Sequence, residues 1–223
     1  MNVLELFAGS RSMGNIAEEL GHNIFSSDID EFDKINYVTD ILEFDVTKVP
    51  FIPDFIWASP PCTFFSVASI GHHWTRTIIG EKAFHTPKSN NAMLGVQIVQ
   101  KTLDIINYFL SKNPNLIWFI ENPRGKLRKL PVMENLPRTT IMYCQYGDTR
   151  MKPTDIWSNN LHSLFNESGF ISKTCFAGNY KCHHEAAPRG SKTGTQGLSN
   201  AYERSKLPKE LCRSIYQSIL NKQ

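Results

Sequence analysis

The stretch that most constrains the fold is the apolar run Phe55-Ile56-Trp57-Ala58, which is followed by Ser59-Pro60-Pro61-Cys62. A short continuous apolar run predicts a buried strand of a parallel sheet. The strand must end at the two prolines, because neither can donate a hydrogen bond to a sheet ladder. Ligands of open α/β sheets bind at the carboxyl ends of strands, so this turn presents Cys62 as a candidate nucleophile. A small buried hydrophobe is the alternative for a free cysteine, and it stays open here.

Size and composition are those of an ordinary water-soluble protein. The chain has 223 residues, 41% of them hydrophobic and 20% charged, which predicts one large domain or one domain with a small appendage. No apolar run approaches the length of a membrane span, and the first residues do not resemble a secretory signal. The five scattered cysteines favour reduced thiols in an intracellular protein.

Charge is distributed unevenly along the chain. Residues 1–60 carry three basic and eleven acidic side chains, whereas the remainder carries 21 basic and 10 acidic ones. A basic part facing an acidic part suggests a polyanion as the partner of the later residues. An ordinary solvated surface explains the same lysines and arginines equally well.

Strand and helix patterns alternate along the first 120 residues, which predicts an α/β sheet. Strands are expected over residues 2–7, 23–27, 37–39, 55–58, 116–120, 139–144 and 154–157, and helices over 15–20, 92–111 and 206–220. Residues 63–91 show no period, so we expect a long lid or binding loop there, or else disorder.

Three strand ends carry residues suited to a nucleoside. The loop 7–14 has two glycines, but its spacing is neither that of a P-loop nor that of a dinucleotide fold. Asp28 ends the next strand, where its carboxylate would accept ribose hydroxyls, and Asp40 ends the third. This order is the layout of an S-adenosylmethionine site, and three ordinary turn residues are the alternative.

The motifs in order resemble the DNA (cytosine-5) methyltransferases. The matching segments are Leu4-Glu5-Leu6-Phe7-Ala8-Gly9 (with Glu5 in place of the usual Asp), Asp28-Ile29-Asp30, Thr39-Asp40-Ile41, Ser59-Pro60-Pro61-Cys62 with Phe65-Ser66, Glu121-Asn122-Pro123 and Ser199-Asn200-Ala201. One motif departs from the family: Tyr146-Gly147 is followed by Asp148-Thr149-Arg150-Met151-Lys152, where the family has Pro-Gln-x-Arg-x-Arg. Arg150 and Lys152 are the candidates for the roles of those arginines.

The resemblance implies a Rossmann-like α/β sheet of the class I S-adenosylmethionine-dependent methyltransferases, with a small recognition insert. It implies a catalytic core over residues 1–152, a target-recognition region over 153–197 and a C-terminal helix over 198–223 that packs back on the core. The expected activity is methylation of carbon 5 of cytosine in double-stranded DNA by a monomer without membrane contact. The small size favours a solitary modifying enzyme of viral or mobile-element origin, located in the cytoplasm of a bacterium or of a phage-infected host.

The same resemblance assigns the chemistry. Cys62 would add to carbon 6 of a cytosine flipped out of the duplex, which makes carbon 5 nucleophilic enough to take a methyl group. Glu121, holding a proton, would bond to ring nitrogen 3 and the exocyclic amine. Arg150 would contact the base carbonyl or stabilise the developing charge.

Binding residues follow from the matched motifs and the basic loops. The cofactor would be held by Phe7, Ala8, Gly9, Ser10, Asp28, Ile29, Asp40, Ile41, Pro60, Asn200 and Ala201. The nucleic acid would be contacted by Ser66, Arg124, Lys126, Arg189 and Gln196.

A group of potential zinc ligands stands apart from these motifs. Cys175, Cys182 and His183 or His184 would need Cys144 or His162 to complete a set of four, and no recognised four-ligand spacing is present. Free thiols and DNA-contacting histidines are therefore favoured, and no metal site is predicted.

Two other functions stay open. The basic loops would serve an RNA cytosine-5 methyltransferase equally well. The altered motif after Gly147 also permits a nucleic-acid-binding protein that has kept the cofactor pocket but lost turnover.

Overall fold

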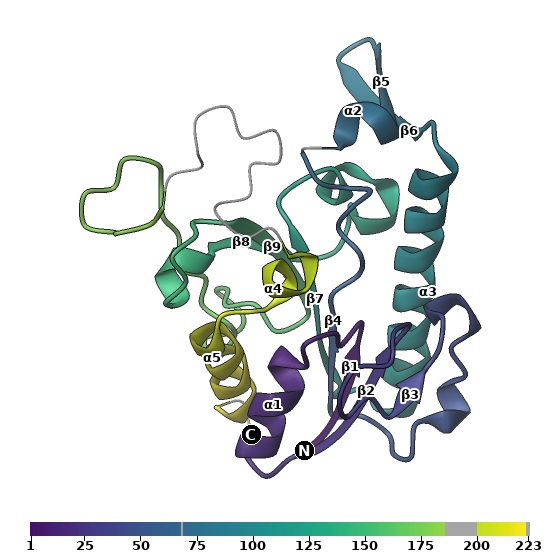
Figure 1. Cartoon of the computed structure of the whole chain (residues 1–223), viewed down its shortest axis with the longest axis vertical. Coiled ribbons are helices and arrows are strands. Elements are labelled where there is room, and N and C mark those ends of the chain that lie inside the picture. The colour runs from purple at the N-terminus through teal and green to yellow at the C-terminus, as the bar shows by residue number, and fades with distance from the viewer. Residues whose placement is uncertain (68, 186–199, 222–223) are drawn as a thin grey trace.

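The fold is built on one seven-stranded sheet with the strand order β3-β2-β1-β4-β7-β9-β8 (Figure 1). The computed structural model describes residues 1–67, 69–185 and 200–221. The strands are β1 (Asn2–Leu6), β2 (Asn23–Asp28), β3 (Tyr37–Val38), β4 (Phe55–Ala58), β7 (Ile117–Pro123), β8 (Arg138–Met142) and β9 (Pro153–Ser158). The first five run parallel, and β9 runs antiparallel to both of its neighbours. Because the chain order reverses between β1 and β4, the sheet has a switch point there, which is where open α/β sheets bind ligands.

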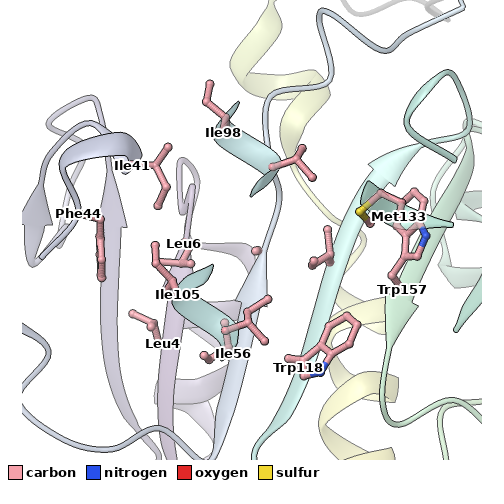
Figure 2. Close-up of a cluster of buried hydrophobic side chains, with 14 of the residues drawn as sticks. Leu4, Leu6, Ile41, Phe44, Ile56, Ile98, Ile105, Trp118, Met133 and Trp157 are labelled. Atoms are coloured by element: carbon pink, nitrogen blue, oxygen red, sulfur yellow. The ribbon is translucent and has the colours of Figure 1, made fainter. Parts of the chain in front are cut away.

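Helices cover both faces of this sheet (Figure 1). Helices α1 (Ser12–Glu19) and α5 (Lys209–Leu220) lie on one face, and the long helix α3 (Asn90–Lys112) lies on the other. Side chains of the buried strands point alternately to the two faces of the sheet: Phe55 packs toward α1 and α5, while Ile56 packs toward α3. Figure 2 shows the α3 side, where Leu4, Leu6, Ile56 and Ile105 lie together.

The predicted Rossmann-like sheet is confirmed, and so are the predicted strands of its parallel part. The expectation that residues 63–91 lack regular structure was wrong, because this segment contains α2 (Ile70–His73) and an antiparallel hairpin of β5 (Trp74–Ile79) and β6 (Lys82–Pro87). Its role as a lid or binding segment stays a prediction. Most side chains of the hairpin are exposed, so no alternation of apolar and polar residues marks its strands.

Smaller differences concern the ends of elements. The C-terminal helix is divided by Pro208 into α4 (Ala201–Ser205) and α5. The strand expected over 139–144 ends at Met142, and the chain continues as the 3₁₀ helix η5 (Tyr143–Tyr146). The other 3₁₀ helices are η1 (Ile41–Glu43), η2 (Val46–Lys48), η3 (Leu127–Lys129) and η4 (Pro131–Met133). The first residues of the expected recognition region 153–197 form β9 of the main sheet.

Among the residues that the structure describes, none of the helices is both long and apolar enough to cross a bilayer.

Candidate active site

The loop after β1 is held in a tight conformation by Asp28. Phe7, Gly9 and Arg11 all have positive φ angles, of 57°, 47° and 52°. The backbone N–H of Gly9 donates to Oδ2 of Asp28 over 2.8 Å, and the N–H of Asp30 donates to Oδ1 over 3.1 Å. Parallel pairing sets Leu6 beside Ser27, so the loop and Asp28 leave their strands at the same edge of the sheet.

Glu5 lies beneath this loop and holds it from below. The residue is only 2% exposed, its Oε1 accepts the N–H of Met13 over 3.1 Å, and its Oε2 accepts the hydroxyl of Ser26 over 3.1 Å. A Cβ atom on Gly14 would lie 2.6 Å from Oε2, so a side chain there would displace the carboxyl group. Burial raises the pKa of Glu5 to about 7, against the lowering effect of these hydrogen bonds.

The residues at this edge fit the expected S-adenosylmethionine. Each Asp28 oxygen retains lone-pair capacity for a ribose hydroxyl, and Ile29 beside it presents an apolar side chain that is 63% exposed. Asp40 caps η1 by accepting the N–H of Leu42 over 2.9 Å, and Ile41 is buried in the cluster under α3. Carboxylates, backbone amides and an apolar surface in one place suit a nucleoside.

The C-terminal segment returns to the same loop. The side chain of Asn200 caps α4 by accepting the N–H of Tyr202 over 2.8 Å. The ring of Tyr202 lies 5.5 Å from that of Phe32, and the N–H of Leu207 donates to Oγ of Ser12 over 3.1 Å. The backbone of Ala201 begins α4.

The turn that carries Cys62 is fixed by its own backbone and by β7. The carbonyl of Cys62 accepts the N–H groups of Phe65 and Ser66 over 3.0 and 2.9 Å, and Asn122 donates to the carbonyl of Pro60 over 2.8 Å. Pro60 is buried, whereas Cys62 is exposed. The thiol is therefore accessible on a turn with little freedom to move.

The chain approaches this turn closely a second time, after β7. A Cβ atom on Gly125 would lie 2.3 Å from the carbonyl oxygen of Phe65, and the N–H of Lys126 donates to that oxygen over 2.7 Å. Only glycine allows this approach without a backbone shift.

Glu121 emerges one strand away from Cys62. Ala58, the last residue of β4, pairs with Ile120 in the parallel register, so Glu121 near the end of β7 lies at the edge of the sheet where the Cys62 turn leaves β4. Glu121 is 6% exposed, and its Oε1 accepts the hydroxyl of Tyr143 over 3.1 Å. Burial raises the pKa of Glu121, whereas Lys152, Tyr143 and Ser59 lower it. Because burial prevails, the carboxyl group favours its protonated form more than an exposed glutamate does.

Lys152 is the cation whose charge acts on both groups. Its ammonium lies 4.5 Å from the centre of the Tyr143 ring and donates to the carbonyl of Arg204 over 3.1 Å. Burial lowers the pKa of Lys152, while Glu121 and Cys62 oppose that shift. Loss of hydration and the charge of Glu121 raise the pKa of the Cys62 thiol, and Lys152 lowers it.

Arg150 lies in a different environment. Its guanidinium forms a two-point ion pair with Asp148, over 2.9 and 2.6 Å. The side chain lines a hollow of about 590 Å³ together with Glu185, Glu203 and Lys206, which is not the place where Cys62 and Glu121 meet. The structure thus brings Cys62 and Glu121 together with Lys152, and it commits the charge of Arg150 to Asp148.

The residues expected at the nucleic acid divide into three sets. Ser66 lies on the turn after Cys62, with its hydroxyl 3.2 Å from that of Ser69, and Arg124 is exposed after β7. Lys126 is only 5% exposed, and its ammonium lies 2.7 Å from Nδ1 of His85 on β6. Arg189 and Gln196 lie outside the described residues.

Sequence reasoning gave no role to two residues of this site, Ser59 and Tyr143. Ser59 belongs to the motif that was recognised, and its hydroxyl accepts the indole N–H of Trp57 over 2.8 Å, which leaves the hydroxyl proton for Glu121. Lys152 had been named with Arg150 as a candidate for the role of the family's arginines, but only Arg150 was assigned to catalysis. Tyr143 carried no signal in the sequence, because it reaches Glu121 only when η5 packs beside β7.

Comparison with known proteins identifies the family. No protein-family model matches the chain. A probable DNA (cytosine-5)-methyltransferase of Frog virus 3 (isolate Goorha) is 30% identical over 190 residues, which are 82% of this chain and 78% of the relative. The crystal structure of the S. pombe Dnmt2 methyltransferase matches with 16% identity and a TM-score of 0.44, over 71% of this chain and about half (49%) of that one. On the first of these matches, the chain belongs to the DNA (cytosine-5)-methyltransferase family, which uses S-adenosylmethionine as its methyl donor.

Proposed function

We propose that this methyltransferase modifies carbon 5 of cytosine in DNA, with Cys62 as the nucleophile and Glu121 as the acid. The observation that carries the proposal is the position of an accessible thiol and a buried carboxyl group at the ends of adjacent parallel strands, β4 and β7. Attack on a ring carbon needs the thiol on one side of the base and a proton donor at its edge.

The chain's residues would act in the following order. The thiolate of Cys62 adds to carbon 6, and protonated Glu121 donates to ring nitrogen 3, so that negative charge does not build up in the ring. S-adenosylmethionine supplies an electrophilic methyl group to carbon 5. The proton on carbon 5 then passes to solvent water, and the electron pair of that C–H bond restores the double bond between carbons 5 and 6. The bond between Cys62 and carbon 6 breaks, the sulfur leaves as a thiolate, and Glu121 takes back the proton it gave to ring nitrogen 3.

Lys152 suits the cationic role in this reaction better than Arg150 does. Its charge lowers the pKa of Cys62, so it stabilises the thiolate that attacks. Arg150 would instead support the site indirectly, since its ion pair with Asp148 holds the backbone just before Lys152. We therefore assign the contact with the polarised base to Lys152 and a positioning role to Arg150.

A group of cations near the hairpin supports binding of a polyanion. Burial lowers the pKa of His85, and the charges of Lys126, Arg76 and Lys129 lower it further. Burial also lowers the pKa of Lys126, and Arg76 and Lys129 again add to the shift. A bound phosphate would reduce the electrostatic repulsion between these cations. Arg128 is a weaker candidate, because it is paired with buried Asp155. The choice of DNA rests on the name of the Frog virus 3 relative.

The test is transfer of label from S-adenosylmethionine to duplex DNA and, separately, to RNA, followed by digestion to nucleosides. The expected product is 5-methylcytosine from DNA. The same product from RNA alone would move the substrate assignment to RNA. Cofactor binding without transfer to either substrate would indicate a binding protein that has lost turnover.

The nucleophile is tested with duplex DNA that carries 5-fluorocytosine at the target position. Fluorine cannot leave carbon 5 as a proton does, so the adduct with Cys62 should persist and survive denaturing electrophoresis. A Cys62→Ser protein should bind the cofactor but form no adduct and transfer no methyl group. Methylation by this variant would refute the proposed mechanism.

A further inference from the structure

Three thiols and an imidazole converge away from the active site, and we propose that they form a structural zinc site. The residues are Cys144 on η5 and Cys175, Cys182 and His184 in the segment that follows Lys173. Their ligand atoms all lie within 4.8 Å of one another, and Sγ of Cys175 is 3.9 Å from Nδ1 of His184. All five cysteines of the chain are free thiols.

This spacing is close to that of a tetrahedral zinc centre. Zinc bonds to sulfur and nitrogen at their usual lengths place neighbouring ligand atoms about 3.5 to 3.8 Å apart. The four side chains therefore need to move only slightly to share one ion. Three cysteines and one histidine are an established ligand set for structural zinc.

Two amide groups are already directed at the sulfur atoms. Nε2 of Gln145 lies 3.3 Å from Sγ of Cys182 and 3.7 Å from Sγ of Cys144, and Nδ2 of Asn179 lies 3.3 Å from Sγ of Cys175. Amide N–H donors around a thiolate centre orient its ligands and share its negative charge. A cluster of neutral thiols in a small hydrophobic core would have no need of them.

The segment that carries three of these ligands has little apolar packing of its own. Leu164, Phe165, Phe176 and Tyr180 are all exposed, and Phe170 and Cys175 are the buried hydrophobic side chains of the described range 159–185. Backbone contacts hold the segment to the core at its ends, where Met142 bonds to Lys173 and Glu185 bonds to Thr149. A region with so small a core commonly depends on a metal or a disulfide.

The position of Cys144 connects this site to the catalytic carboxyl group. Cys144 directly follows Tyr143, whose hydroxyl donates to Glu121. The ion would thus hold the segment Lys173–Glu185 against η5 and keep η5 in register beside β7. Its role is structural, because its four ligands lie on η5 and in the segment Lys173–Glu185, whereas Cys62 and Glu121 lie at the ends of β4 and β7.

The proposal is tested by metal analysis of the full chain, purified under reducing conditions without a chelator. We expect about one zinc ion per chain. A Cys182→Ser or His184→Ala protein should lose most of the bound zinc, whereas His183→Ala, a change at the exposed neighbouring histidine, should retain it. Cys62→Ser should retain it too, which separates this site from the proposed catalytic function.

A second measurement keeps the test valid if a ligand variant fails to fold. Cobalt exchanged into the unaltered protein should give the strong visible bands of a tetrahedral site and the near-ultraviolet bands of thiolate ligation. Reduced protein that contains no zinc and shows no such bands on cobalt addition would overturn the proposal. So would zinc content that is equal in the His183→Ala and His184→Ala proteins.

Discussion

Replacing Glu5 by glutamine removes a carboxyl group whose pKa burial raises to about 7, from an ordinary value of 4.5. The folded state therefore holds the proton of Glu5 more tightly than the unfolded chain does. The contribution of Glu5 to the unfolding free energy is fully present below about pH 4.5. It is lost as the pH rises toward about 7, and above that pH the loss levels off. A shift of this size corresponds to about 3 kcal/mol of unfolding free energy at pH 7.

The measurement is urea unfolding of the wild type and of Glu5→Gln at several pH values between 5 and 8. Other groups also titrate in this range, so the informative quantity is the difference between the two proteins at each pH. Glutamine has no carboxyl group to ionise, so the unfolding free energy of the variant should fall less with rising pH than that of the wild type. Between pH 5 and 8 the unfolding free energy of the variant should rise relative to that of the wild type by about 2–3 kcal/mol. The size of the difference at any single pH depends on the new hydrogen bonds to Met13 and Ser26, but the change of that difference with pH does not.

Glu18 on α1 provides a control of the opposite kind. Hydrogen bonds from Arg11 and Lys34 lower the pKa of this carboxyl group. The difference between wild type and Glu18→Gln should therefore be constant above about pH 5 and change only below it. A Glu5→Gln difference that is equally constant from pH 5 to 8 would refute the argument, because Glu5 would then be ionised in the folded state at ordinary pH.

Three further predictions concern the active site. Glu121→Gln should speed alkylation of Cys62 by iodoacetamide at pH 8, because the variant cannot form the carboxylate whose charge raises the pKa of the thiol. The same variant should slow methyl transfer about 10²-fold or more, because it has no acidic proton to donate. Lys152→Met should slow both alkylation and transfer, since it removes the charge that lowers that pKa; alkylation rates that respond in the same direction in both variants would contradict this electrostatic arrangement. Gly125→Ala should lower the unfolding free energy by about 1–3 kcal/mol, because its Cβ would lie 2.3 Å from a backbone oxygen of the Cys62 turn. Gly71→Ala, where the added atom meets nothing within 4 Å, is its control, and equal unfolding free energies for the two proteins would contradict the packing argument.

The parallel part of the sheet could be predicted because burial on both faces leaves a direct signal in the sequence. The run Phe55–Ala58 is buried throughout, and its alternate side chains serve the two faces. The strands expected over 55–58 and 116–120 pair directly as β4 and β7, which brings Glu121 beside the turn that carries Cys62. The hairpin of β5 and β6 could not be found in this way, because its strands form without burying a face.

Interactions between distant segments were beyond the reach of the sequence. Arg150 and Lys152 are two residues apart and equally basic, and only the packing of Asp148 and Tyr143 gives them different surroundings. The sequence offered Cys144 and His162 as alternative partners of Cys175 and Cys182, but Cys144 and Cys175 are 31 positions apart, so spacing rules for metal motifs could not choose between them. The assignment of single residues to catalysis and binding stays a prediction until the variants are measured.

The hairpin of β5 and β6 has a consequence for the motions of this enzyme. It is a two-stranded sheet of its own, and Trp74 at its base is its buried hydrophobic side chain, bonded through its indole N–H to the carbonyl of Phe64. Two-stranded hairpins with little burial open far more readily than a packed core does. The amide hydrogens of β5 and β6 should therefore exchange with solvent long before those of β1 and β4, because the hairpin can open while the seven-stranded sheet stays folded.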